Sequence, residues 1–166
     1  MSRRIEGAAR RLLTHPAGWI ATGFGSGLAP VAPGTFGTFA ALLPWLALRE
    51  LPLALYLGVL AAAFLLGIWA ANWTIRRLGV HDPGLVVWDE FIGLWIALIA
   101  VPERWYFVLA GVALFRFFDI VKPWPVRWAD RRVKGGFGTM LDDVLAGLYA
   151  LVALQASVWA SARLAG

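Results

Sequence analysis

Long runs of apolar residues are the feature that most constrains how this chain can fold. The runs are Thr35–Leu48, Leu53–Trp73, Leu85–Val101, Trp105–Ile120 and Val144–Ala162. A helix that crosses a bilayer needs roughly 20 apolar residues, so the second and fifth runs are long enough alone. The first is short, and the third contains Asp89 and Glu90. We therefore predict an all-α, integral membrane helical bundle with about five hydrophobic helices, four or five of them full spans.

The composition favours a membrane protein over a soluble one, in which the runs would be core helices. Hydrophobic residues make up 60% of the 166 residues and charged residues only 15%, which leaves more apolar surface than a soluble domain of this length can bury. The ten Trp residues agree, because Trp is enriched at membrane interfaces. We expect a single membrane-embedded domain over residues 1–166.

The N-terminal stretch is basic and amphipathic, and it lacks a long apolar core ahead of a cleavage site. This pattern predicts a short interfacial helix rather than a secretory signal peptide. The chain has no cysteine, which excludes a thiolate nucleophile, zinc–thiolate sites and disulfides.

Basic residues are distributed unevenly over the polar stretches that separate the apolar runs. If successive runs cross the membrane, twelve of the 15 Lys and Arg residues share one face: Arg3, Arg4, Arg10, Arg11, Arg76, Arg77, Arg116, Lys122, Arg127, Arg131, Arg132 and Lys134. Because Lys and Arg are enriched on the inner side of membranes, this face is predicted to be cytoplasmic. The net charge of +5 is thus explained by membrane orientation and anionic headgroups, and we expect no nucleic acid and no obligate protein partner.

Two pairs of acids occur where apolar runs begin, Asp89 with Glu90 and Asp142 with Asp143. A carboxylate at the centre of a membrane helix costs ~2.5–3.5 kcal/mol, and less near an interface, so a compensating cation is expected. Four carboxylates with no thiol and only two His residues suit Mg²⁺ better than zinc. The alternatives are solvated headgroup-level acids for the first pair and simple helix-dipole stabilisation for the second.

Candidate phosphate ligands accompany the acids. Asp119 and Lys122 stand three residues apart near the end of an apolar run, and Lys122, Arg116 and Arg127 are candidates to hold a phosphate, although the positive-inside bias alone would also explain basic residues there. The segment GFGSGLAPVAPGT, residues 23–35, is rich in Gly and suits close approach to an anion. Gly25, Ser26 and Thr35 are its substrate-binding candidates, and a flexible membrane-entry loop is the alternative.

Four segments together resemble the phosphatidylglycerophosphatase A family: GFGSGLAPVAPGT at 23–35, HDPGLVVWDEFIG at 81–93, FRFFDIVKPWPVRWADR at 115–131 and GGFGTMLDDVLAG at 135–147. They follow the order and spacing of that family and extend over most of residues 20–155. The resemblance implies an all-α, Mg²⁺-dependent enzyme of the bacterial inner membrane. It also implies the reaction, which is hydrolysis of the terminal phosphate of phosphatidylglycerophosphate to give phosphatidylglycerol.

The chemistry of the residues suggests roles within that reaction. Asp89, Glu90, Asp142 and Asp143 are predicted to hold one or two Mg²⁺ ions. Asp119 is a candidate base for an attacking water, or a further metal ligand. His81 is a candidate acid for the leaving glycerol oxygen, with a plain turn residue as the alternative, and Asp82 beside it is a further catalytic candidate.

Two other functions were weighed against this one. A lipid phosphatase with a His nucleophile would need a Ser-Gly-His triplet and a second catalytic His, and this chain has neither. A cation-binding membrane carrier without phosphatase activity would also place carboxylates at helix ends. Such a carrier usually keeps its charges near the bilayer midplane, whereas these acids are predicted at one interface.

Overall fold

The apolar runs of the sequence form helices, as predicted. The computed structural model describes residues 12–80 and 83–164. Its elements are α2 (Pro16–Ala21), the 3₁₀ turn η1 (Ser26–Leu28), α3 (Pro33–Leu48), α4 (Leu53–Leu78), α5 (Trp88–Ala97), α6 (Trp105–Val121), α7 (Val126–Arg132) and α8 (Gly135–Leu164). No strand occurs in these two ranges, so the all-α prediction is confirmed. Residues 1–11 of the N-terminal stretch that we predicted to be an amphipathic helix lie outside the described residues, and the described part of that stretch contains the short helix α2.

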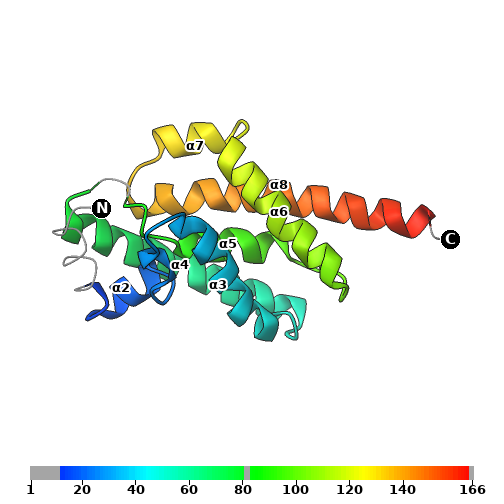
Figure 1. Ribbon diagram of the computed structural model, residues 1–166, viewed down its shortest axis with the longest axis horizontal. Coiled ribbons are helices and arrows are strands. Elements are labelled where there is room, and N and C mark those ends of the chain that lie inside the picture. The colour runs from blue at the N-terminus through cyan, green and yellow to red at the C-terminus, as the bar shows by residue number, and fades with distance from the viewer. Residues whose placement is uncertain (1–11, 81–82, 165–166) are drawn as a thin grey trace.

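Helix α5 is the centre of the bundle (Figure 1). Every residue of α5 except Asp89 is buried, and α3, α4, α6 and α8 all pack against it. Its two tryptophans are tied to neighbouring helices, because the indole of Trp88 donates to the carbonyl oxygen of Ala63 and that of Trp95 donates to Ala41, both at 2.9 Å. These hydrogen bonds satisfy the indole N–H groups inside the core and fix how α5 sits between α3 and α4.

Two glycines allow α5 and α8 to approach closely. A Cβ at Gly147 of α8 would collide with the carbonyl oxygen of Gly93, and a Cβ at Gly93 would lie 2.8 Å from the carbonyl oxygen of Asp143. Side chains at either position would therefore push the helices apart. The approach matters for function because it brings the first turn of α5, with Asp89 and Glu90, next to the acids of α8.

We expect Gly147→Val to destabilise the protein by about 1–3 kcal/mol, the usual cost of overpacking, and to reduce activity by moving α8 away from α5. Gly58→Val is the matched control, because a Cβ at Gly58 meets nothing within 4 Å. Thermal unfolding in detergent measures both effects. Equal unfolding temperatures for the two variants would contradict a close α5–α8 contact.

Two of the described helices are long and apolar enough to cross a membrane, α4 with 26 residues and α8 with 30. Only 17% and 22% of their most apolar windows are buried, so their apolar faces are largely open. Helix α3 has 16 residues and α5 has 10, which correspond to ~24 Å and ~15 Å at 1.5 Å per residue. The prediction of four or five full spans is therefore not confirmed. The third run is shorter as a helix because Leu85–Val87 precede α5 and a turn follows it at Leu98.

The outer surface of the bundle is apolar while charged groups gather inside one end. Leu43 of α3, Leu65 of α4 and Val152 of α8 are each more than 60% exposed, and contiguous apolar surface of this kind marks contact with lipid or protein. Helices α4 and α8 run antiparallel, and the N–H of Gly136 donates to Oδ1 of Asn72 at 2.8 Å. The C-terminal end of α4 thus meets the N-terminal end of α8, which is the polar end of the bundle.

Candidate active site

A pocket of about 530 Å³ opens at the polar end of the bundle. Its charged lining residues come from α5, α6, α7, α8 and the segments between them: Asp89, Glu90, Asp119, Lys122, Asp130, Arg131, Lys134, Asp142 and Asp143. We call it the acidic pocket. It brings together all four predicted metal ligands, the candidate base Asp119 and the candidate phosphate ligand Lys122. Segments that are 50 residues apart in the sequence therefore share one concave site.

The two acids of α8 that line the pocket lie within the helix and not at its N-terminal end. Helix α8 begins at Gly135, so the Gly-rich segment at residues 135–138 forms the entry and first turn of the helix. Asp142 and Asp143 lie two turns further on, and both are buried. The effect of the helix dipole falls off within the first turn. Helix-dipole stabilisation, the alternative explanation for this pair, therefore does not account for their position.

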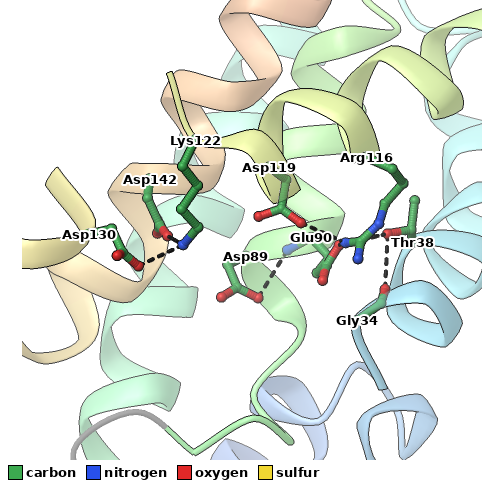
Figure 2. Close-up of polar contacts among 9 residues, drawn as sticks. All are labelled: Gly34, Thr38, Asp89, Glu90, Arg116, Asp119, Lys122, Asp130 and Asp142. Atoms are coloured by element: carbon green, nitrogen blue, oxygen red, sulfur yellow. Dashed lines mark hydrogen bonds and ion pairs between the residues drawn. The ribbon is translucent and has the colours of Figure 1, made fainter. Parts of the chain in front are cut away.

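Lys122 bridges two acids at one side of the pocket (Figure 2). Its ammonium group donates to Oδ1 of Asp130 and to Oδ2 of Asp142, each at 2.6 Å. Burial lowers the pKa of Lys122, but the hydrogen bonds and charges of the two acids outweigh this effect and raise the pKa above its ordinary value. Lys122 is therefore a fixed positive charge in the pocket throughout the physiological pH range.

Arg116 joins a second group of acids. Its Nη1 atom contacts Glu90 and lies 2.8 Å from Oδ2 of Asp119, and the hydroxyl of Thr38 donates to the same Glu90 oxygen at 2.6 Å (Figure 2). Arg116 is not among the residues that line the pocket. Its guanidinium is engaged by acids of the chain itself, so the geometry favours a role in positioning Glu90 and Asp119 over direct contact with a phosphate.

Asp89 and Asp143 differ from the other acids of the pocket because neither makes an ion pair within the described residues. Asp89 accepts a hydrogen bond from the N–H of Glu90 at 3.0 Å, and in the view of Figure 2 it lies between the Lys122 and Arg116 groups. Asp143 is 4% exposed. Carboxylates so close together and shielded from water need a cation to be stable as anions. These two are the acids that remain available to a bound ion.

The donor set of the pocket fits Mg²⁺. Within the part of the chain that the structure describes, no group of three or more acidic or His side chains is already arranged around a metal position. Mg²⁺ does not require such a group, because it keeps several waters and is usually bound through one or two carboxylates together with substrate phosphates. Asp89 and Asp143 supply two carboxylates without cation partners, while Glu90 is paired with Arg116 and Asp142 with Lys122.

Other predicted site residues lie elsewhere. Arg127 is exposed and donates to the carbonyl oxygen of Val121 at 3.2 Å. Ser26 donates to the carbonyl oxygen of Gly23 at 2.8 Å, and Gly25 has the left-handed φ of +92° that begins η1, so both serve the turn. Neither they nor Thr35 line the acidic pocket. His81 and Asp82 lie outside the described residues; Gly84, which follows them in the sequence, lines the pocket.

Thr38 and Asp130 were not predicted as residues of the site, whereas Gly34 belongs to the Gly-rich segment 23–35 that was expected close to an anion. Thr38 fixes Glu90, Asp130 shares Lys122 with Asp142, and Gly34 lines the pocket where a Cβ would collide with Glu90. Asp130 carried one signal, since it lies in the mixed-charge stretch that also contains Lys122. Thr38 carried none, because a single hydroxyl in an apolar run looks the same whether or not a distant acid lies beside it.

Comparison with known proteins gives a consistent family. The family model described as phosphatidylglycerophosphatase A matches residues 19–158. The chain is 46% identical to "Phosphatidylglycerophosphatase A" of Escherichia coli (strain K12) over 150 residues, which cover 89% of this chain and 87% of the relative. It is 47% identical to the protein of the same name from Haemophilus influenzae over 146 residues, with 87% and 90% covered.

A third relative carries a different name. It is "Putative phosphatidylinositol-3-phosphatase" of Bacteroides thetaiotaomicron, 49% identical over 148 residues, with 84% of this chain and 92% of the relative covered. No solved structure matches the chain. The match of the family model over most of the chain, and two relatives of that name, confirm the resemblance found in the sequence: the chain belongs to the phosphatidylglycerophosphatase A family.

Proposed function

We propose that this protein hydrolyses the terminal phosphate of phosphatidylglycerophosphate, with Mg²⁺ as cofactor, to give phosphatidylglycerol and inorganic phosphate. The single observation that carries the proposal is the acidic pocket, where Lys122, Asp89 and Asp143 line one opening at the polar end of an apolar bundle and the two acids make no ion pair with any other described residue. A phosphate at headgroup level could enter such a pocket while its acyl chains remain in the bilayer. The names of the Escherichia coli and Haemophilus influenzae relatives support the same substrate.

Asp89 and Asp143 are the residues that would hold Mg²⁺, with Glu90 and Asp142 close enough in the pocket to exchange their cation partners for it. Bound there, Mg²⁺ would neutralise the charge on the phosphate oxygens as the P–O bond breaks. The fixed charge of Lys122 complements this arrangement, because its ammonium group can turn from Asp130 and Asp142 to a phosphate oxygen. The four predicted metal ligands thus differ in role. Asp89 and Asp143 would bind the ion directly, whereas Glu90 and Asp142 would first have to leave Arg116 and Lys122.

The proposed reaction is direct attack of water on phosphorus. A bond forms between the water oxygen and phosphorus, and the bond between phosphorus and the terminal glycerol oxygen breaks. Asp119, which Arg116 holds at the edge of the pocket, accepts the proton of the attacking water. His81 donates a proton to the leaving glycerol oxygen, and Asp82, its neighbour in the sequence, remains a further catalytic candidate.

We also propose that the protein is a multi-pass protein of the bacterial inner membrane with the pocket on the cytoplasmic side. The lengths and open apolar faces of α4 and α8 support crossing by these two helices. The shorter α3 and α6 would pack beside them, and α5 would enter without crossing alone. The concentration of Lys and Arg at the polar end supports the orientation.

The direct test is phosphate release by the purified protein from phosphatidylglycerophosphate in neutral-detergent micelles. We expect turnover with Mg²⁺, loss of turnover when EDTA removes the ion, and recovery when Mg²⁺ is added back in excess. Turnover that survives EDTA would contradict the role of the metal and would favour the phosphatase class that uses a His nucleophile.

Two parallel measurements separate the remaining alternatives. Cation flux through proteoliposomes without any phosphate release would show that the protein is a cation carrier and not a phosphatase. Phosphatidylinositol 3-phosphate is the second substrate to assay, because the Bacteroides thetaiotaomicron relative is named for it. Faster release from that lipid would keep the reaction type but contradict the assigned headgroup.

A further inference from the structure

A second, shallower pocket of about 410 Å³ adjoins the acidic pocket. It lies between the end of α6 and the outer side of α7, and we call it the basic groove. Its charged and aromatic lining residues are Lys122, Trp124, Arg127, Trp128, Arg131 and Arg132. Lys122 and Arg131 line both pockets. The acidic pocket and the basic groove therefore meet at these two side chains.

The basic groove has the opposite charge to the acidic pocket. Arg127, Arg131 and Arg132 are all exposed, and none of them pairs with an acid within residues 12–80 and 83–164. Three guanidinium groups on one short helix, with no described acid paired to them, make this surface attractive to anions. Arg favours phosphate anions in particular, because its planar fork can donate two parallel hydrogen bonds.

The groove also exposes large apolar surface beside these charges. Trp124 is 78% exposed, Trp128 53% and Val121 45%. Figure 1 shows α7 on the outside of the bundle, next to the N-terminal half of α8. A ligand that fits this surface has an anionic group close to an apolar chain, which is the chemistry of a phospholipid at the level where its headgroup meets its acyl chains.

We propose that the basic groove binds the phosphodiester and the acylated glycerol of the lipid substrate while the terminal phosphate enters the acidic pocket. The inference rests on the proposed function and adds the orientation of the substrate. Phosphatidylglycerophosphate carries an inner diester and a terminal monoester, separated by one glycerol unit. The two adjoining pockets match this order. All charged side chains of the groove are cations, which suits the singly charged diester. The acidic pocket provides the proposed metal site and Lys122 for the monoester.

Two arginines make the proposal testable, because Arg127 and Arg132 line the groove and not the acidic pocket. The variant is Arg127→Gln with Arg132→Gln. The matched control is Arg76→Gln with Arg77→Gln, which removes the same charge from two exposed arginines in the last turn of α4. The probe is phosphatidylglycerol in neutral-detergent micelles, because it carries the diester and no monoester. Equilibrium binding of phosphatidylglycerol and of inorganic phosphate is measured with Mg²⁺ present.

We expect the groove variant to weaken phosphatidylglycerol binding about tenfold or more, the equivalent of losing one charge-assisted hydrogen bond, and to leave inorganic phosphate binding within twofold of the parent. The control should bind both as the parent does. The inference is overturned if the groove variant binds phosphatidylglycerol like the parent, if the control loses as much, or if both ligands are weakened equally.

Phosphate release from phosphatidylglycerophosphate is assayed with the same preparations. The groove variant should show a KM raised about tenfold with kcat little changed, because the diester contacts are made equally in the ground state and the transition state. A parent protein that binds phosphatidylglycerol through the groove but releases no phosphate would overturn the proposed function and leave the lipid site standing. A parent that releases phosphate while the groove variant behaves identically would overturn the lipid site alone.

Discussion

Asp89→Asn and Asp143→Asn should each lower phosphate release from phosphatidylglycerophosphate by on the order of 10³-fold, because each removes one of the two acids that lack a cation partner and that would hold Mg²⁺. Asn preserves the shape of the side chain and removes its charge. The neutral side chain also relieves repulsion among the clustered acids, so we expect the variants to be at least as stable as the parent. Loss of activity with unchanged or raised thermal stability is the result that identifies a metal site.

Glu103→Gln is the control for this pair, because Glu103 is an exposed acid that lines a different pocket, with Trp45 and Tyr56. It should retain the activity of the parent. The affinity for Mg²⁺ is measured separately from turnover, through the Mg²⁺ dependence of the unfolding temperature. Near-normal activity in both Asn variants, or an undiminished stabilisation by Mg²⁺, would contradict the assignment of Asp89 and Asp143.

Arg116→Met should destabilise the protein by about 3–5 kcal/mol, which is the usual cost of removing one partner from a buried ion pair. Arg116 neutralises Glu90 and Asp119 together, and Glu90 is buried. Methionine fills much of the same volume without charge. The lost stability is therefore caused by the two carboxylates that no longer have a cation partner, and not by a cavity. Thermal unfolding in detergent measures the effect.

A second substitution distinguishes positioning from phosphate binding. Arg116→Met combined with Glu90→Gln should recover a large part of the lost stability, because the neutral amide no longer needs a cation. Arg104→Met is the control, since Arg104 is exposed and makes no ion pair in the described part of the chain. If Arg116 instead binds the substrate phosphate, Arg116→Met will raise KM and leave the unfolding temperature unchanged, and the double variant will bring no recovery.

Patterns along the chain were enough to predict the helical class, the family and the polarity of the bundle. The helical class and the polarity follow from local composition, whereas the family was inferred from four segments that resemble it. An apolar run predicts a helix in any context, and acids within such a run demand compensation wherever they are buried. The grouping of Asp89, Glu90, Asp119, Lys122, Asp142 and Asp143 in one pocket was predicted from the same reasoning, since all six lie in polar stretches assigned to one face.

Helix boundaries were harder to predict, because a glycine can either form a turn at a helix end or allow close packing within a helix. In α8, Gly135 has a left-handed φ of +73° where the chain enters the helix, whereas Gly136 lies in the first turn, where its N–H is bonded to Asn72 and a Cβ would collide with α4. A glycine required for close packing and a glycine required for a turn are identical in a sequence. Only the packing of the neighbouring helix shows which role a glycine has. For this reason Asp142 and Asp143, which were predicted at the start of α8, lie in its third turn.

By itself, then, the sequence determined which segments are helical, which end of them is charged and which residue types are available for phosphate chemistry, because these properties depend on neighbours along the chain. Tertiary structure alone decided which acids are already neutralised. Glu90 and Arg116 are 26 residues apart, and Lys122 and Asp142 are 20 apart, so their pairing depends on how α5, α6 and α8 pack. That packing, permitted by Gly93 and Gly147, places Asp89 and Asp143 in the acidic pocket without an ion pair to any other residue that the structure describes.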